Sequence, residues 1–245
     1  MPTLPTAILF DLDDTIISAY RQPEAAWLAV AGEMADAIAP VSPQRVAQLI
    51  AREARLFWDD PDNHRVGRLD LAVARRAIVG GARARLAAEG HPVFAAEVGA
   101  RLADRFTAYR DEQMHVFPGA LETIDTLRAA GVRLALITNG DGPRQRAKVE
   151  RFDLARRFDH IQIEGEAGFG KPEERAYRHA MDALGVQSHQ TWIVGDNIEW
   201  EVAAPQTLGL HAVWHDHLGA GLPPGSTVKP DRIIRALPEL LSEQG

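Results

Sequence analysis

The chain has 245 residues, of which 46% are hydrophobic and 25% charged, and its formal net charge at pH 7 is -7. This length suits one large α/β domain or a core with a smaller insert. The acidic balance argues against a nucleic-acid surface, which needs a basic face, and the absence of cysteine excludes disulfides, thiol chemistry and thiolate zinc sites.

The N-terminal residues show no targeting or membrane pattern. No basic segment is followed by a long apolar run, and no run approaches the roughly 18 apolar residues of a membrane span. We therefore expect a cytoplasmic protein with neither a membrane nor a nucleic acid as partner.

The first expected element is a buried strand that ends in carboxylates. Ala7 to Phe10 form an unbroken apolar run, which is typical of a parallel strand covered on both faces. Asp11 and Asp13 would then lie at the carboxyl edge of the sheet, where ligands of open α/β sheets bind. Carboxylates this close need a cation among them, or one of them keeps its proton. An acidic turn is the alternative, because Asp is common in turns.

The next segment, 18–115, is predicted to be an all-helical insert that forms a second domain. Four helices are expected from apolar spacing and cap residues: 19–39, 43–58, 68–89 and 93–113. Pro40 ends the first helix, and Ser42 with Pro43 begins the second. We expect a loop at 59–63 from its composition and an interruption near Gly80-Gly81.

Strands and helices alternate over residues 116–245. The expected strands are 132–137, 160–163, 191–194 and 210–214, with a short edge strand at 232–234. The expected helices are 120–130, 143–152, one from Pro172 to Leu184, one ending near Leu208, and a last helix at the C-terminus. Residues 165–170 are a glycine-rich loop. Gly185 is expected to cap the helix that ends at Leu184. This alternation indicates an α/β fold with a parallel sheet and right-handed crossovers, built from 1–17 and 116–245.

Polar residues follow several of the expected strands and should gather at one edge of the sheet. They are Asp11 and Asp13, Thr138 and Asn139, Lys171 from the loop after the third strand, and Asp196 with Asn197. Taken singly, each has an ordinary explanation, such as a strand-to-helix turn or a solvated surface lysine. Their combination at strand ends favours a site for phosphoryl transfer.

Three aspartates would carry the chemistry of such a site. Asp11 would attack phosphorus and form an aspartyl phosphate. Asp13 would protonate the leaving oxygen and later take a proton from the attacking water. Mg²⁺ would bind Asp11, Asp196 and the backbone carbonyl of Asp13, which allows an anionic nucleophile to approach an anionic phosphate.

The remaining groups would hold the transferred phosphoryl group. The Thr138 hydroxyl and the backbone N–H of Asn139 would bind phosphoryl oxygens, and Lys171 would supply further positive charge. Lys171 is one of three lysines in the chain, with Lys148 and Lys229.

These motifs resemble the signature of the haloacid dehalogenase-like (HAD) hydrolases over essentially the whole chain. The matching residues, in order along the chain, are Asp11, Asp13 and Thr15, then Thr138, Lys171 and Gly195-Asp196. The resemblance implies a Rossmann-like core with a helical cap similar to the C1 cap of the first subfamily. It also implies a Mg²⁺-dependent phosphatase whose cap closes over a small phosphorylated substrate, such as a sugar phosphate or a nucleoside monophosphate.

One departure from the family pattern concerns the surroundings of the metal. The family often has a second Asp five residues after the first of the GD motif, where this chain has Glu201, with Glu199 closer. Asp13 argues against the dehalogenating members of the family. A phosphomutase of the same fold and a non-catalytic, metal-binding regulatory protein remain alternatives.

Candidate specificity residues are Arg21, Trp58, His64 and Arg68, which could contact the leaving group of a substrate. Packing of Trp58 within the insert and solvation of Arg68 are the alternatives. The histidines at 211, 215 and 217 suggest a zinc cluster, but neutral surface histidines are favoured because no matching set of ligands is evident. Both a monomer and a homodimer are compatible with the sequence.

Overall fold

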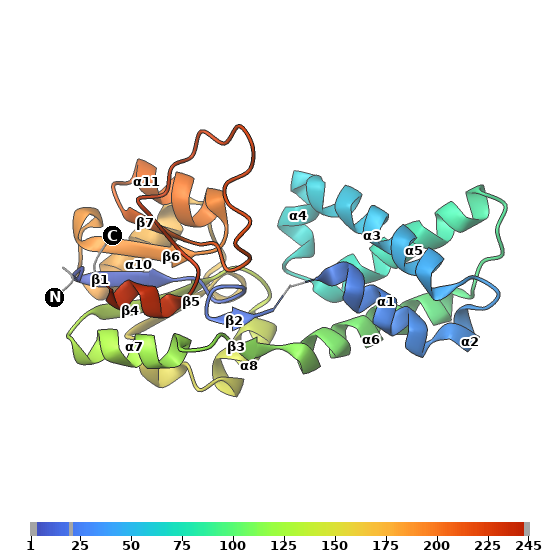
Figure 1. Cartoon of the computed structure of the whole chain (residues 1–245), viewed down its shortest axis with the longest axis horizontal. Coiled ribbons are helices and arrows are strands. Elements are labelled where there is room, and N and C mark those ends of the chain that lie inside the picture. Colours follow the sequence, from blue (N-terminus) through green and yellow to red (C-terminus); the bar gives the residue numbers. More distant parts are fainter. Residues whose placement is uncertain (1–3, 20–21, 243–245) are drawn as a thin grey trace. The chain divides into compact units, whose positions relative to one another are not determined.

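The computed structural model describes residues 4–19 and 22–242. Contacts divide the chain into two compact units, Met1–Ser18 with His115–Gly245 and Ala19–Met114. We call the first the core unit and the second the cap unit; the sequence suggested 1–17 with 116–245, and 18–115. Figure 1 shows the strands gathered in the core unit and, among the described residues, helices alone in the cap unit. Each unit has a hydrophobic core of its own.

A six-stranded parallel sheet forms the centre of the core unit, in the order β5-β4-β1-β6-β7-β8. Its strands are β1 (Ala7–Phe10), β4 (Arg133–Thr138), β5 (His160–Ile163), β6 (Thr191–Gly195), β7 (His211–His215) and β8 (Arg232–Ile234). β1 lies between β4 and β6, with Phe10 opposite Leu136 and Val194. The expected α/β core is therefore confirmed, and β1 delivers its last residue to the middle of the carboxyl edge.

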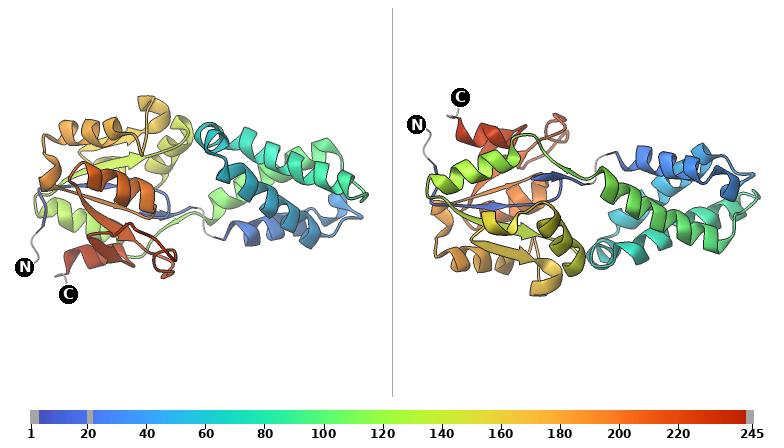
Figure 2. Two further views of the ribbon diagram at one scale, coloured as in Figure 1. Left: turned by 90° about the horizontal axis from the view of Figure 1, so that it is seen from above. Right: turned by 90° about the horizontal axis from the view of Figure 1, so that it is seen from below.

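Helices cover both faces of this sheet (Figure 2). They are α7 (Ala120–Ala129), α8 (Gly142–Arg151), α9 (Glu164–Ala167), α10 (Glu174–Leu184) and α11 (Ala204–Thr207). Side chains alternate along β1, so Ala7 and Leu9 join the cluster that includes α10, while Ile8 and Phe10 point to the opposite face. All four are fully buried, which explains the absence of polar residues in this strand.

Several segments of the core unit differ from the sequence-based expectation. The glycine-rich loop at 165–170 begins within the short helix α9. The helix expected to end near Leu208 is a short π-helix, η3 (Ile198–Ala203), followed by α11. The helix expected at the C-terminus is a 3₁₀ turn, η4 (Leu237–Leu241). Two further 3₁₀ turns are η1 (Ala155–Arg157) and η2 (Ser188–Gln190).

A two-stranded antiparallel ribbon, absent from the sequence-based prediction, joins the two chain segments that border the insert. Its strands are β2 (Ile17–Ser18) and β3 (His115–Val116), and Phe117 also donates its N–H to the carbonyl of Ile16. The loop that follows Asp11 is thereby tied to the segment before α7.

The cap unit contains helices throughout, with a separate core. They are α1 (Pro23–Glu33), α2 (Ala35–Ile38), α3 (Pro43–Asp59), α4 (Pro61–Gly67), α5 (Leu71–Ala88) and α6 (Ala96–Gln113). Trp27 and Phe106 stack in this core, with their ring centroids 3.6 Å apart. Among the described residues of the chain, no helix has the length and apolar character needed to cross a membrane.

Three expectations for the cap unit were wrong. The single helix expected at 19–39 is instead two helices, α1 and α2, separated at Met34. The loop expected at 59–63 instead starts α4, because the Asp60 carboxylate accepts the N–H groups of Asp62 and Asn63 and Pro61 occupies the first turn. The break expected near Gly80-Gly81 does not occur, since α5 runs through both residues. Gly81 packs close to Glu53 of α3, so tertiary packing offsets the low helix propensity of glycine there.

Candidate active site

Asp11 lies directly after β1 and continues its hydrogen bonding to the next strand. Its N–H donates to the carbonyl of Val194 at 2.9 Å, and its side chain is buried. The chain then turns tightly, and the Thr15 hydroxyl donates to Asp11 Oδ2 at 3.0 Å. One oxygen of this carboxylate is therefore oriented by a residue of the same turn.

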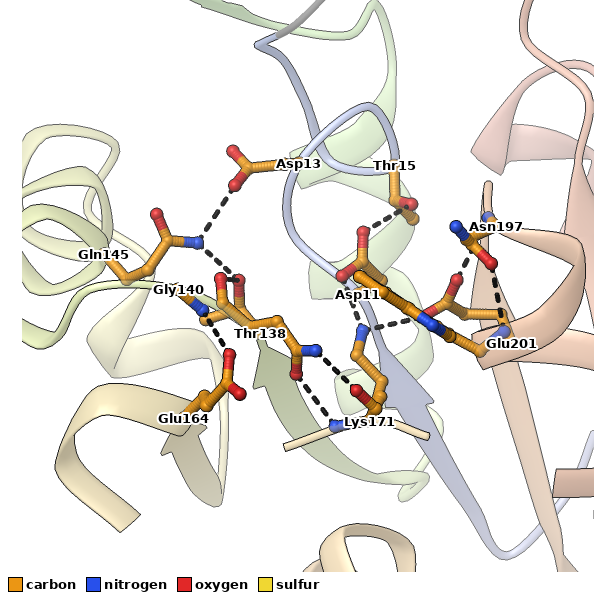
Figure 3. Close-up of polar contacts among 12 residues, drawn as sticks. Asp11, Asp13, Thr15, Thr138, Gly140, Gln145, Glu164, Lys171, Asn197 and Glu201 are labelled. Atoms are coloured by element: carbon orange, nitrogen blue, oxygen red, sulfur yellow. Dashed lines mark hydrogen bonds and ion pairs between the residues drawn. The ribbon is translucent and has the colours of Figure 1, made fainter. Parts of the chain in front are cut away.

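Lys171 meets the other oxygen of the same carboxylate. Its Nζ lies 2.6 Å from Asp11 Oδ1 and 2.6 Å from Glu201 Oε1, and its side chain is 1% exposed (Figure 3). Burial lowers the pKa of this ammonium, but the two carboxylates outweigh burial and hold the pKa well above its ordinary value. The surface-lysine alternative is wrong for this residue, which is a buried cation fixed between two acids.

Asn139 fixes the backbone on which Lys171 is carried. Its Oδ1 accepts the N–H of Lys171 at 2.9 Å, and its Nδ2 donates to the carbonyl of Lys171 at 2.6 Å. A Cβ on Gly170 would lie 2.5 Å from Asn139 Oδ1, so glycine is needed for this close approach. The turn after β4, which directly follows the buried Thr138, is thus fixed to the loop that carries Lys171.

Asp196 and Glu201 follow β6, the strand beside β1. Glu201 is 1% exposed and accepts the N–H of Asn197 at 3.0 Å, in addition to its contact with Lys171. A Cβ on Gly195 would overlap the Glu201 side chain, so this glycine makes room for it. In this structure Glu201 is the second partner of the lysine, while Glu199 is exposed.

Negative charge at this edge of the sheet exceeds positive charge. Burial, then Asp11, Glu201 and Asp14, raise the pKa of Asp196 to about 9. Burial also raises the pKa of Glu201 to about 7 and raises that of Asp11, although Lys171 opposes both shifts. The carboxylates here are destabilised in their ionised form, which is the condition that a bound cation relieves.

The donor set fits a magnesium ion better than a metal held by protein side chains alone. Among residues 4–19 and 22–242, no three Asp, Glu, His or Cys side chains gather closely enough to form a metal site. Magnesium usually keeps several waters and binds one or two carboxylates together with substrate phosphate. Asp11, Asp196 and the carbonyl of Asp13 would meet that requirement.

The Asp13 side chain contacts α8, a helix that the sequence analysis did not single out. Both of its oxygens lie 2.7 Å from Lys148 Nζ, and Gln145 Nε2 donates to Oδ2 at 2.9 Å. The same amide nitrogen donates to the Thr138 hydroxyl at 2.5 Å (Figure 3). The scarcity of lysine and the three-residue spacing of Gln145 and Lys148 on one helix face were the available signals.

The candidate specificity residues from the sequence belong to the cap unit or fall outside the described residues. Trp58 packs against the cap-unit core and contacts Phe57 and His64 edge to face, in line with the packing alternative. His64 and Arg68 are half-buried in the cap unit, and Arg21 lies outside the described residues.

One of the three C-terminal histidines, His215, is not the surface group that was expected. His215 is 1% exposed and contacts the Asp14 carbonyl through Nδ1 at 3.2 Å, while His211 and His217 are half-buried. Burial and the neighbouring His217 lower the pKa of His215 to about 4, so its ring is neutral at pH 7. The surface assignment was wrong for His215 because it occupies the end of the buried strand β7.

Comparison with known proteins gives a consistent family. The family model for haloacid dehalogenase-like hydrolases matches residues 5–209. The phosphoserine phosphatase of Thermus thermophilus is 37% identical over 116 residues, which are 47% of this chain and 46% of that protein. The N-acylneuraminate-9-phosphatase of Rattus norvegicus is 37% identical over 110 residues, 44% of each chain. These matches span less than half the length of the relatives.

A solved structure extends the likeness of fold to nearly the whole chain. The putative HAD-hydrolase YfnB from Bacillus subtilis, bound to magnesium, superposes with a TM-score of 0.69 at 23% identity over 97% of both chains. At this identity the superposition concerns the fold alone.

Proposed function

This chain belongs to the haloacid dehalogenase-like hydrolase family, and we propose that it is a Mg²⁺-dependent phosphatase that works through an aspartyl phosphate. The observation that carries the proposal is the Asp11 carboxylate, which follows the central strand and is held by Thr15 on one oxygen and Lys171 on the other. The phosphatases among its relatives support the same activity. The substrate is a small phosphorylated metabolite of the sugar phosphate or nucleoside monophosphate class.

In the first half of the proposed reaction, a carboxylate oxygen of Asp11 attacks phosphorus. The new oxygen–phosphorus bond forms as the bond to the leaving oxygen breaks, and that oxygen keeps the electron pair and takes a proton from Asp13. In the second half, Asp13 takes a proton from water, whose oxygen attacks the same phosphorus. Inorganic phosphate is released and the Asp11 carboxylate is restored.

Other residues hold the groups that react. The Thr138 hydroxyl and the N–H of Asn139 bind phosphoryl oxygens, and Lys171 balances the charge that accumulates between Asp11 and the phosphate. Asp11, Asp196 and the Asp13 carbonyl would hold Mg²⁺, whose charge allows two anions to approach each other.

Hydrolysis of 4-nitrophenyl phosphate by the purified full chain, with and without Mg²⁺, tests the proposal. We expect Mg²⁺-dependent release of inorganic phosphate, and an Asp11→Asn variant should lose activity by several orders of magnitude. Asp182→Asn, which changes an exposed aspartate of α10, is the matched control and should remain active.

Two results would contradict the proposal. Equal activity in Asp11→Asn would exclude Asp11 as the nucleophile. Transfer of phosphate within or between substrates, without release of inorganic phosphate from a panel of phosphorylated metabolites, would favour a phosphomutase. Binding of Mg²⁺ with no turnover of any member of the panel would favour a regulatory protein.

A further inference from the structure

The Asp13 carboxylate is held by two side chains of one helix, neither of which has a role in the proposed reaction. Lys148 Nζ lies 2.7 Å from both Asp13 oxygens, and Gln145 Nε2 donates to Asp13 Oδ2 at 2.9 Å. All three side chains are shielded from solvent, with 7% of Lys148 and 14% of Asp13 exposed and Gln145 buried. These contacts orient the carboxylate, because a group bonded through both oxygens cannot rotate freely.

Gln145 also joins Asp13 to the residue proposed to bind phosphate. A side-chain amide nitrogen carries two hydrogens in a fixed plane, and here one is directed to Asp13 Oδ2 and the other to Thr138 Oγ1 (Figure 3). The position of the carboxylate is therefore set relative to the Thr138 hydroxyl.

The helix that supplies both side chains begins beside the phosphate-binding turn. α8 starts at Gly142, shortly after Thr138 and Asn139, and Gln145 and Lys148 are neighbours on its buried face. Helix α8 thus carries Gln145 and Lys148, the two side chains that bind Asp13. It also follows directly after the turn proposed to bind the phosphoryl group. A displacement of about 1 Å in such a group can cost about 10²-fold in rate.

We propose that Lys148 and Gln145 are positioning residues for proton transfer by Asp13, a role that rests on the proposed phosphatase function. They hold the Asp13 carboxylate at the leaving oxygen of the substrate. Gln145 fixes the position of this carboxylate relative to the Thr138 hydroxyl. Their contribution is therefore largest when the leaving group needs a proton, and small when it departs as a stable anion.

The dependence on the leaving group separates this role from ordinary structural support. An alkyl phosphate needs its leaving oxygen protonated, whereas 4-nitrophenolate leaves without a proton. We measure kcat and KM for both kinds of substrate with wild type, Asp13→Asn, Lys148→Met and Lys148→Arg. The ratio of the alkyl to the aryl kcat/KM within one variant does not depend on how much of the protein is folded.

We expect Lys148→Met to lower this ratio by about 10²-fold, mainly through kcat for the alkyl phosphate. Lys148→Arg should restore part of the ratio because it keeps the charge. The double variant Asp13→Asn with Lys148→Met should have the same ratio as Asp13→Asn alone, since Lys148 acts through Asp13. Arg146→Met removes a half-buried cation of the same helix that pairs with Glu166, and its ratio should equal that of wild type.

Gln145→Leu provides a second test, on the side chain that joins Asp13 to Thr138. It removes both donated hydrogen bonds without adding charge, so the ratio should fall as it does for Lys148→Met. The KM for both substrates should also rise, because Thr138 loses its partner.

Three results would overturn the inference. If Asp13→Asn lowers the ratio and Lys148→Met lowers both rates equally, the inference fails while the proposed function stands. An effect of Lys148→Met confined to KM and shared by both substrates would place Lys148 on the substrate instead. A wild-type protein that hydrolyses neither substrate would overturn the proposed function and this inference with it.

Discussion

Asp196 is the residue at which the excess of negative charge in the site should have the clearest effect on the pH dependence of stability. Its pKa is raised from 3.8 to about 9 by burial and by its acidic neighbours. Between these two values the folded protein holds a proton that the unfolded chain has released. The free energy of unfolding should therefore fall as the pH rises, by up to about 1.4 kcal/mol per pH unit for one proton.

The effect of Asp196 on stability is best measured above pH 6.5. The lowered pKa of His215, about 4, has the opposite effect between 4 and 6.5, because there the unfolded chain binds the extra proton. We expect chemical denaturation without Mg²⁺ to show declining stability from about pH 6.5 to about pH 8.5. Added Mg²⁺ should stabilise the protein more at the higher pH, since it binds the ionised carboxylates.

Asp196→Asn is the variant that tests this assignment. An amide carries no charge at any of these pH values, so the variant should lose most of the decline and most of the stabilisation by Mg²⁺. A wild-type protein whose stability is level over the same range, or a variant that responds to Mg²⁺ as wild type does, would contradict it.

At the level of single residues, the sequence indicated which groups gather and little about how they are paired. Asp11, Thr138, Lys171 and Asp196 stand at strand or loop ends, and the edge of a parallel sheet brings such positions together. The contact between Lys148 and Asp13 joins positions far apart in the chain and depends on the direction of one helix face. Periodicity gives no means of locating that contact.

At the level of secondary structure, burial explains which elements could be predicted. The central strands β1, β4 and β6 are covered on both faces, so they read largely as apolar runs. All six strands of the sheet were expected within a few residues of their observed positions. The ribbon of β2 and β3 has two residues in each strand, too few to show a period. α5 was expected to break at Gly80-Gly81 because local propensity was weighed without the packing of its neighbours.

Two glycine-to-alanine substitutions should change the stability of the protein in opposite directions. A Cβ on Gly80 meets nothing within 4 Å, so Gly80→Ala in α5 should stabilise the protein by about 0.5 to 1 kcal/mol. A Cβ on Gly165 would overlap the Gly142 backbone nitrogen and lie 2.9 Å from the Gly140 carbonyl oxygen. Gly165→Ala should therefore destabilise by about 1 to 3 kcal/mol.

Gly165→Ala should also lower turnover, because the turn at Gly140 follows the proposed phosphate-binding residues Thr138 and Asn139. Urea denaturation and hydrolysis of 4-nitrophenyl phosphate measure the two effects. Gly80→Ala serves as the control, since it makes the same chemical change in the cap unit. Equal stability changes in the two variants would mean that the close backbone approach at Gly165 is relieved at no cost.

At the level of the whole molecule, each of the two units has a hydrophobic core of its own among the described residues. One core lies within the cap unit and includes Leu102 of α6, which is fully buried. The other lies within the core unit and includes Leu184 at the end of α10. The chain enters and leaves the cap unit once, so the local contacts within each unit can form without the other.

The two cores should therefore respond separately to loss of packing. Leu102→Ala and Leu184→Ala make the same chemical change, and each should cost about 2 to 5 kcal/mol in its own unit. Native-state hydrogen exchange should show faster exchange of amides in α5 and α6 for Leu102→Ala, and in β4 and α10 for Leu184→Ala. If Leu102→Ala speeds exchange in β4 as much as in α6, the two units unfold as one, and the division into separate cores has no energetic meaning.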